Sequence, residues 1–331
     1  MSSLKFVVDQ NSNSLKFQQL VDAIIDSISR SQLKEGDMMP SVNQIMKESQ
    51  LSRDTVFKAY AELKKRGVVV SVPNRGYFVT KNITKIFLFL DTFKAYKEVL
   101  YGSFLKHLQK NISVDLHFHH YNIELFEKII SESIGKYSKF VIMNFDHKKV
   151  PNIINKIPKE QLLIIDWKIH TTENQSVVYQ NFGDSLFNCL QRNLNEIKKY
   201  DEFTFIYPPF TYHPKITINY FEKFCIDNDI KYSVLFDIEK FKIKNNGLYF
   251  LVSDRTLASF LDQCSEKGFE PGREVGVISY NETPMKKYVK NGITVISTDF
   301  KLMGKKAAEF VNSGIAIRVE IPTELKMRSS I

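Results

Sequence analysis

Arg53 and Arg75 are the side chains of this sequence that best suit recognition of a nucleic acid. Arginine can donate to O6 and N7 of guanine together, and a good bidentate pair discriminates by roughly 1 to 3 kcal/mol. Both arginines lie in residues 53–81, which carry seven Lys or Arg against two Asp or Glu, whereas residues 1–52 carry five against six. This local positive charge favours a phosphate backbone as the partner, although a solvated helix face would also explain it.

Three short helices are expected to position Arg53. Apolar residues recur at helical spacing over residues 14–30, which predicts the first helix. Ser41 and Gln44 form a capping box at the start of the second, and Ser52 is the expected N-cap of the third. A tight connection between the last two helices is typical of a helix-turn-helix, whose last helix enters the major groove by its N-terminal end.

A two-stranded wing is expected after the third helix. Gly67 is the expected C′ residue of that helix. Residues 68–72 and 77–79 have the composition of strands, and the turn Pro73-Asn74-Arg75-Gly76 lies between them. The wing would hold Arg75 at its tip, within reach of a minor groove or the DNA backbone.

Residues 15–80 resemble the winged helix-turn-helix of the GntR family of bacterial transcription regulators. The matching motifs are Gly36-Asp37, Pro40-Ser41, Ser52-Arg53-x-Thr55-Val56, Ala59-Tyr60-x-x-Leu63, Arg66-Gly67 and Arg75-Gly76-Tyr77-Phe78-Val79. The resemblance implies that Arg53 reads bases and that the Thr55 hydroxyl contacts the DNA backbone. Asn43 stands where an arginine usually follows the Pro-Ser pair, and Phe57 stands where some members carry another DNA-contacting arginine. The operator preference of the family therefore does not carry over.

The residues expected at the DNA come from the starts of the second and third helices and from the wing. They are Ser41, Asn43, Ser52, Arg53, Thr55, Lys58, Arg75 and Gly76. For Lys58, as for Lys64, Lys65 and Arg66 after it, an ordinary solvated helix face explains the charge as well as phosphate contact does.

From Lys85 onward, short apolar strands alternate with helical stretches. Strands are predicted at 86–90, 114–118, 140–143, 162–165, 203–206, 249–252 and 275–278, and helices at 97–110 and 123–135. Continuous apolar runs with helices interposed indicate parallel sheets covered on both faces. The segment is long for one such sheet. The predicted fold is therefore α/β, with a winged helix-turn-helix over 1–80, a linker over 81–85 and two parallel-sheet lobes over 86–331.

A ligand is expected in the crevice between the two lobes, at the carboxyl ends of the strands. The loops that follow these strands mix aromatic rings with Asp, Asn and Lys. Such a lining suits a sugar, because its C–H faces stack on rings while its hydroxyls bond planar polar side chains. For any single aromatic residue, core packing is the more common role.

The segment from about residue 84 to the end resembles the periplasmic-sugar-binding-protein-like sensor of LacI-type repressors. The clearest matches are residues 272–284, Gly304-x-x-Ala307-Ala308 and Pro322-x-Glu324-Leu325-x-x-Arg328-Ser329-Ser330. The resemblance implies that Asn281 occupies the position of a ligand-binding aspartate. It also implies that Asn181 matches the asparagine of a mid-chain Asp-Asn pair.

Departures from this second family imply a neutral ligand. Besides Asn281, Ser253 replaces an asparagine, and Leu186 stands where many relatives have a ligand-clasping arginine. Lys94, Lys168 and Lys215 could compensate for the missing charge. The expected ligand-binding residues are Asp91, Phe93, Lys94, Tyr96, Phe145, Trp167, Asn181, Ser253, Asp254, Tyr280 and Asn281.

No enzyme, cofactor or metal site is predicted. The sequence contains no G-x-G-x-x-G, G-x-x-x-x-G-K-[ST], H-E-x-x-H or G-x-S-x-G motif. His117, His119 and His120 form the only histidine cluster, with too few donors for a metal. The three cysteines are far apart in sequence and are expected to be small buried hydrophobes. No run of 18 apolar residues occurs, so we expect a soluble, cytoplasmic protein.

Together these features predict a homodimeric transcription regulator, most simply a repressor, that binds a palindromic operator and responds to a small carbohydrate. A dimer is expected because one helix reads only a few base pairs. Two alternatives remain open at this point. The second segment could serve only for dimerisation, or the chain could be a sugar-modifying enzyme fused to a DNA reader.

Overall fold

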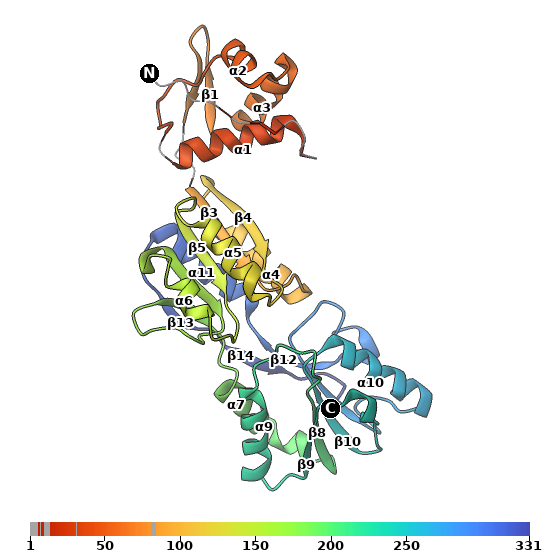
Figure 1. Cartoon of the computed structure of the whole chain (residues 1–331). Helices are drawn as coiled ribbons and strands as arrows, with labels where there is room; N and C mark the ends of the chain where they lie inside the picture. Colours follow the sequence, from red (N-terminus) through yellow and green to blue (C-terminus); the bar gives the residue numbers. More distant parts are fainter. Residues whose placement is uncertain (1–5, 7, 10–13, 31, 81–83) are drawn as a thin grey trace.

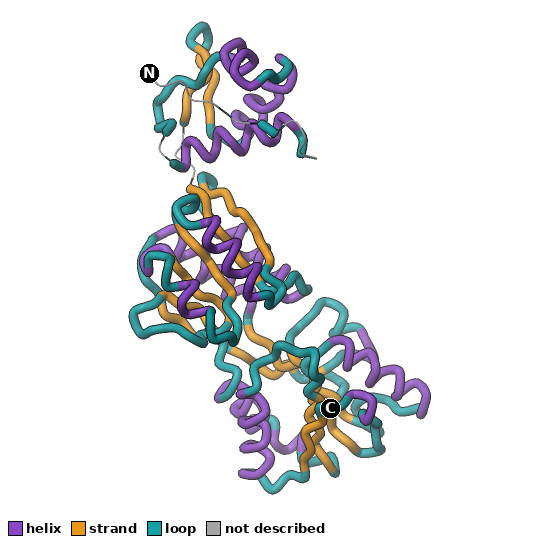
Figure 2. The backbone as a smooth tube through the Cα atoms, viewed as in Figure 1, coloured by secondary structure: helices purple, strands orange, loops and turns teal. Residues whose placement is uncertain are grey.

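The computed structural model of this 331-residue chain describes residues 6, 8–9, 14–30, 32–80 and 84–331. A small helical domain at the N-terminus is followed by two α/β lobes, and the C-terminus lies in the second lobe (Figure 1). Figure 2 shows the strands of each lobe side by side, with helices packed against them. The predicted fold class is confirmed.

The N-terminal domain is a winged helix-turn-helix. It consists of α1 (Lys16–Ser29), α2 (Val42–Ser49), α3 (Arg53–Lys65) and the antiparallel strands β1 (Val69–Val72) and β2 (Gly76–Val79). Ser41 and Ser52 cap α2 and α3 as expected, since each hydroxyl accepts the amide of the third residue onward, at 3.2 and 3.3 Å. Gly76 adopts φ +104° at the tip of the wing, a conformation that favours glycine.

The core of this domain gathers the buried face of each helix. Leu20 and Ile24 of α1 and Val56 of α3 are fully buried. Tyr60 is also fully buried, and its hydroxyl donates to the Pro40 carbonyl at the start of the turn. A buried phenol with a satisfied hydroxyl fixes the approach of α2 to α3.

The first lobe is a six-stranded parallel sheet in the order β13-β7-β6-β5-β3-β4. Its elements are β3 (Thr84–Leu90), α4 (Ala95–His107), β4 (Ile112–Phe118), α5 (Ile123–Ser133), β5 (Lys139–Met143), α6 (Val150–Ile154), the 3₁₀ helix η1 (Lys159–Gln161), β6 (Leu162–Asp166), β7 (Ser176–Tyr179), α11 (Phe300–Ser313) and β13 (Arg318–Glu320). Leu88 packs on the face covered by α4 and α11, and Phe87 and Phe89 pack on the face of α5 and α6. Burial on both faces explains the continuous apolar run of β3.

The second lobe is a six-stranded sheet in the order β14-β12-β11-β10-β8-β9, in which β14 alone is antiparallel to its neighbour. Its elements are α7 (Asp184–Arg192), α8 (Leu194–Ile197), β8 (Glu202–Ile206), α9 (Ile216–Asp227), β9 (Tyr232–Leu235), η2 (Ile238–Lys240), β10 (Gly247–Leu251), α10 (Asp254–Lys267), β11 (Gly276–Tyr280), η3 (Val289–Asn291), β12 (Thr294–Thr298) and β14 (Thr323–Lys326). Phe205, Phe221 and Phe250 are fully buried in its centre.

The chain crosses between the lobes three times: between β7 and α7, between β12 and α11, and between β13 and β14. Helix α11 therefore follows a strand of the second lobe but packs against α4 of the first. The seven strands predicted from sequence lie within two residues of the observed ones. Strands β7, β9, β12, β13 and β14 were not predicted.

Two other sequence predictions have a structural outcome. Cys189, Cys225 and Cys264 are buried free thiols, as expected. Of the predicted linker over 81–85, residues 81–83 lie outside the described residues, and Thr84 and Lys85 open strand β3. No helix within the described residues is long and apolar enough to span a bilayer.

An ion cluster joins the N-terminal domain to the first lobe. Lys85 Nζ on β3 lies 3.5 Å from Asp26 Oδ1 of α1 and 3.6 Å from Asp115 Oδ2 of β4. Tyr137 donates its hydroxyl to Asp115 Oδ2 at 2.8 Å. The Lys85 side chain is only 15% exposed, so solvent screens these contacts less than it screens an exposed pair.

The packing of α11 on α4 yields a stability prediction with a matched control. A Cβ on Gly304 of α11 would lie 2.3 Å from the Leu100 carbonyl oxygen of α4, whereas a Cβ on Gly102 of α4 meets nothing within 4 Å. Gly304→Ala should therefore lower the melting temperature by pushing the helices apart. Gly102→Ala should keep or raise it, because alanine is favoured over glycine within helices by roughly 0.5–1 kcal/mol. Equal melting temperatures for both variants in a calorimetric scan would contradict this packing.

Candidate functional site

Helix α3 presents Arg53 to solvent at its first residue. The Ser52 hydroxyl lies 2.8 Å from that of Thr55, in addition to capping the helix, so the two hydroxyls hold each other at this end. The Arg53 guanidinium lies 5.5 Å from the centroid of the Phe57 ring, one turn further along. Arg53, Phe57 and Lys58 are all exposed, whereas Thr55 is half-buried.

The other predicted DNA-binding residues are also accessible. Ser41, Asn43, Ser52, Arg75 and Gly76 are exposed. Arg75 lies at the wing tip, with its guanidinium 5.6 Å from the Phe78 ring centroid. The structure thus leaves the base-reading and phosphate-binding candidates free for a ligand, while the buried sides of the same elements form the core.

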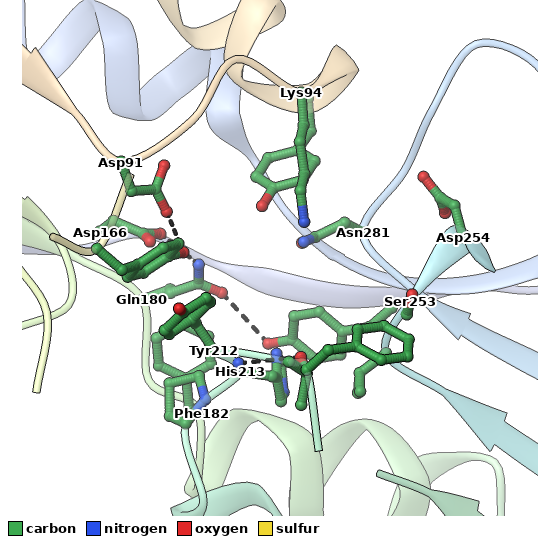
Figure 3. A pocket seen from close by; sticks show the side chains of 17 residues that line it. Asp91, Lys94, Asp166, Gln180, Phe182, Tyr212, His213, Ser253, Asp254 and Asn281 are labelled. Atoms are coloured by element: carbon green, nitrogen blue, oxygen red, sulfur yellow. Dashed lines mark hydrogen bonds between the residues drawn. The ribbon is translucent and has the colours of Figure 1, made fainter. Parts of the chain in front are cut away.

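A polar cavity lies between the lobes at the carboxyl ends of the strands (Figure 3). It is lined by Asp91, Lys94, Tyr96, Tyr121, Asp166, Gln180, Phe182, Phe210, Thr211, Tyr212, His213, Pro214, Val252, Ser253, Asp254, Tyr280 and Asn281. Asp91 follows β3, Asp166 ends β6 and Asn281 follows β11, so the two sheets supply the lining from opposite sides. This is the crevice that the strand pattern predicted.

Seven of the eleven predicted ligand residues line this cavity: Asp91, Lys94, Tyr96, Ser253, Asp254, Tyr280 and Asn281. Phe145 and Trp167 line an adjoining cavity instead, and Phe145 stacks on the buried His119 at 5.0 Å. Phe93 lies outside both cavities, against the edges of Tyr101 and Phe118.

Asn181 also lies outside the cavity lining. Its Oδ1 accepts the amides of Gly183 and Asp184, each at 3.1 Å, where α7 begins. The neighbouring Gln180 lines the cavity in its place. Sequence reasoning selected Asn181 from a family pattern, and that pattern was one residue away from the side chain that the structure directs into the cleft.

Several lining residues were not selected from the sequence: Tyr121, Asp166, Gln180, Phe182 and residues 210–214. A signal existed for some of them, because Asp166, Phe210 and Tyr212 stand in loops after predicted strands. Tyr121 had none, since it follows the end of β4 by three residues and enters the cleft in a left-handed conformation at φ 59°.

The carboxylates of the cavity are already partnered by the protein. Asp91 forms an ion pair with Lys97 and accepts the hydroxyl of Tyr121, and both ions are almost fully buried. Burial lowers the pKa of Lys97 to about 8, while the nearby Asp166 carboxyl acts in the opposite direction. Burial raises the pKa of Asp166, and the Lys97 charge and a hydrogen bond from Gln180 counteract part of this rise.

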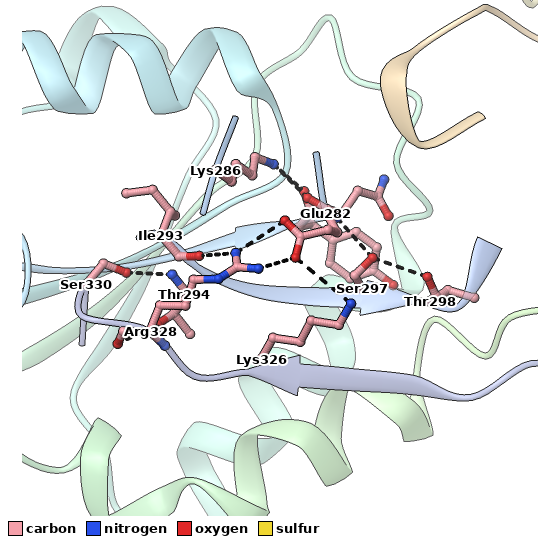
Figure 4. A network of polar contacts seen from close by, with 11 residues as sticks. Glu282, Lys286, Ile293, Thr294, Ser297, Thr298, Lys326, Arg328 and Ser330 are labelled. Atoms are coloured by element: carbon pink, nitrogen blue, oxygen red, sulfur yellow. Dashed lines mark hydrogen bonds and ion pairs between the residues drawn. The ribbon is translucent and has the colours of Figure 1, made fainter. Parts of the chain in front are cut away.

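The second lobe has a similar arrangement. Lys286 is 3% exposed and donates to the carbonyls of Tyr280 and Asn281 at 3.0 and 2.8 Å, and its Nζ lies 2.8 Å from Asp254 Oδ1. Behind it, Arg328 forms an ion pair with Glu282 through both terminal nitrogens (Figure 4). This network fixes the loop that holds Asn281 at φ 62° over the cavity.

Two buried polar atoms of the lining have no partner among the described residues: His213 Nε2 and Asn281 Oδ1. Burial, assisted by the Lys94 charge, lowers the pKa of His213 to about 3, so its imidazole is neutral at physiological pH. Because unpaired buried polar groups are costly, these atoms mark where a ligand would supply hydrogen bonds.

Gln180 links the cavity to the crossovers. Its Nε2 donates to Asp166 Oδ1 at 2.5 Å, and its Oε1 accepts from Tyr280 and Thr298 at 3.2 and 2.7 Å. The Thr298 hydroxyl lies 2.6 Å from that of Thr323. Residues 180, 298 and 323 stand on the three crossovers, so one buried amide connects all of them to the ligand cavity.

Two tyrosines close the cleft from opposite lobes. Tyr121 follows β4 of the first lobe and Tyr212 follows β8 of the second, and their rings stack 3.7 Å apart at an interplanar angle of 4°. Phe182 and His213 pack around Tyr280 below them. The lobes are therefore held together at the cleft by an aromatic contact that a hinge motion would have to break.

Comparison with known proteins assigns both parts of the chain to known domain types. Residues 16–79 match the family described as bacterial regulatory proteins, gntR family, and residues 236–331 match the periplasmic binding protein-like domain. The HTH-type transcriptional regulator YcxD of Bacillus subtilis is 36% identical over 70 residues, which are 21% of this chain and 16% of YcxD. The B. subtilis repressor YtrA is 27% identical over 75 residues, 23% of this chain and 58% of YtrA.

Solved structures of LacI-family regulators share the two-lobed fold. The trehalose repressor from Escherichia coli has a TM-score of 0.62 at 11% identity, over 73% of this chain and 99% of that one. A LacI family regulator from Lactobacillus casei with bound glucose has a TM-score of 0.62 at 12% identity, over 75% and 100%. The chain thus combines a gntR-type helix-turn-helix domain with a periplasmic-binding-protein-like domain.

The buried Asp91–Lys97 pair yields a second prediction. Lys97→Met should lower the free energy of unfolding by about 3–5 kcal/mol, because it leaves a buried carboxylate without its partner. Asp91→Asn should cost less, because Lys97, with a pKa near 8, can release its proton. The double variant should be more stable than the two single losses add up to. Strict additivity in urea unfolding would contradict the pairing.

Proposed function

We propose that this protein is a homodimeric transcription regulator of the cytoplasm, and specifically a repressor. In this proposal its affinity for a palindromic operator is controlled by a small neutral carbohydrate, most simply a monosaccharide, held between the lobes. The observation that carries the proposal is the polar interlobe cavity joined, in one chain, to a gntR-type DNA-binding domain.

The charge balance of the cavity supports a neutral ligand. Asp91 and Asp254 are each compensated by a buried lysine, Lys97 and Lys286. A ligand therefore needs no charge of its own to be accommodated, and Lys94 at the exposed rim is the cation that the cavity has in excess. Neutral donors and acceptors beside aromatic rings match the alternating hydroxyls and C–H faces of a sugar.

The hinge contacts support control of DNA binding by that ligand. A ligand that favours one lobe arrangement shifts the population toward it, by as much as its affinity for the two arrangements differs. The Gln180 amide connects the cavity to all three crossovers, and Lys85 connects the first lobe to α1. In a dimer, a change in lobe arrangement would alter the spacing of the two α3 helices and so the fit to two half-sites.

Arg53 tests the DNA-binding half of the proposal. Arg53→Ala should lower affinity for the selected operator by roughly 1–3 kcal/mol and relax the preference at one base pair in each half-site. Lys64→Ala, on the exposed side of the same helix, serves as the control and should weaken all sequences equally. Fluorescence anisotropy with operator and scrambled duplexes measures both. Unchanged sequence preference in the arginine variant would contradict the assignment.

Calorimetry with a panel of neutral monosaccharides, glucose among them, tests the ligand half. One sugar should bind, and Asn281→Ala should weaken it by up to about tenfold through loss of a hydrogen bond. Phe93→Ala is the control, because Phe93 lies outside the cavity, and should leave affinity unchanged. Silence across the panel would favour a sensor-like part used only for dimerisation, and chemical turnover of a sugar would favour an enzyme.

A further inference from the structure

Phe57 is an apolar side chain on the face of α3 that should meet DNA. Along α3, every residue of which the structure describes, the exposed positions are Arg53, Asp54, Phe57, Lys58, Ala61, Lys64 and Lys65. The core-facing aromatic residue of this helix, Tyr60, is fully buried, whereas Phe57 is 41% exposed. Single exposed apolar residues are common on protein surfaces, so its position must decide whether it has a role.

That position is one helical turn from Arg53 and on the same side of the helix. The guanidinium lies 5.5 Å from the Phe57 ring centroid, so the two side chains form one surface. Four residues advance about 6 Å along a helix, and base pairs are stacked about 3.4 Å apart. Two side chains with this offset reach adjacent or next-but-one base pairs when the helix lies in the major groove.

The chemistry of a phenyl ring selects among the bases. The major-groove edges of guanine, adenine and cytosine offer hydrogen-bond donors and acceptors, whereas thymine also presents an apolar C5 methyl group. A ring placed against a polar edge would strip water from it without replacing the hydrogen bonds, which is unfavourable. A ring placed against the methyl buries two apolar surfaces at once.

We infer that Phe57 is a specificity-determining residue that contacts the C5 methyl of a thymine within two base pairs of the guanine read by Arg53. The inference rests on the proposed DNA-binding function and adds to it a base and an atom. The stacked guanidinium and ring then form a composite reader, in which Arg53 supplies directed hydrogen bonds and Phe57 supplies the apolar contact.

Replacement of thymine by deoxyuridine tests this directly, because it removes only the C5 methyl. The full-length protein is first used to select its site from a random duplex library. Each thymine of that site is then replaced in turn by deoxyuridine, and affinities are measured by fluorescence anisotropy. One thymine per half-site should show a loss of about fourfold, the ratio to which about 0.8 kcal/mol per buried methyl-sized group converts.

Variants separate the ring from the rest of the helix. Phe57→Ala should bind the thymine and deoxyuridine duplexes equally, while Phe57→Leu, which keeps an apolar side chain, should retain part of the difference. Lys64→Ala should weaken both duplexes and leave their ratio unchanged. Because Phe57 is outside the core, each variant should keep the wild-type melting temperature, which a thermal scan checks.

The outcomes distinguish this inference from the function on which it rests. If the wild-type protein selects no sequence, the proposed function is wrong. If it selects a site but binds every deoxyuridine duplex as tightly as the parent, or if Phe57→Ala retains the full preference for thymine, DNA binding stands and the role given to Phe57 is overturned.

Discussion

The structure depends on the hydrogen bonds of one buried amide. Gln180 bonds the cavity carboxyl of Asp166 with its nitrogen, and Tyr280 and Thr298 with its oxygen. Because Thr298 in turn bonds Thr323, every passage of the chain between the lobes is tied to the floor of the cavity. Hydrogen bonds in such a buried network reinforce one another and are expensive to leave unmade. A ligand that alters the surroundings of Asp166 therefore acts on the hinge directly.

Charge compensation explains how a cavity with three carboxyl groups can suit an uncharged ligand. Lys97 and Lys286 approach Asp91 and Asp254 from inside the protein and leave oxygen atoms and backbone carbonyls as hydrogen-bonding groups. The same lysines hold the cavity walls in place, since Lys286 also bonds two carbonyls of the β11 loop. The ion pairs thus shape the site, and the neutral groups, such as the Asn281 amide, remain available for recognition.

Local signals in the sequence predicted the winged helix and the strands well. Hydroxyl caps at Ser41 and Ser52 and the glycine at the wing tip act within a few residues, so they can be read without the fold. The crossovers could not be predicted, because the return of α11 to the first lobe depends on contacts such as Gly304 against Leu100, which are 204 positions apart. For the same reason the pairing of Lys97 with Asp91 and the entry of Gln180 rather than Asn181 into the cavity required the structure.

The coupling between cavity and DNA is tested most directly by a linkage measurement on the full-length protein. The affinity for the identified sugar is measured by calorimetry with and without saturating operator, and operator affinity is measured with and without saturating sugar. Linkage requires both affinities to change by one common factor, and repression relieved by the sugar requires a decrease. A sugar affinity that is the same on free and operator-bound protein would contradict the account, because the two parts of the chain would then act independently.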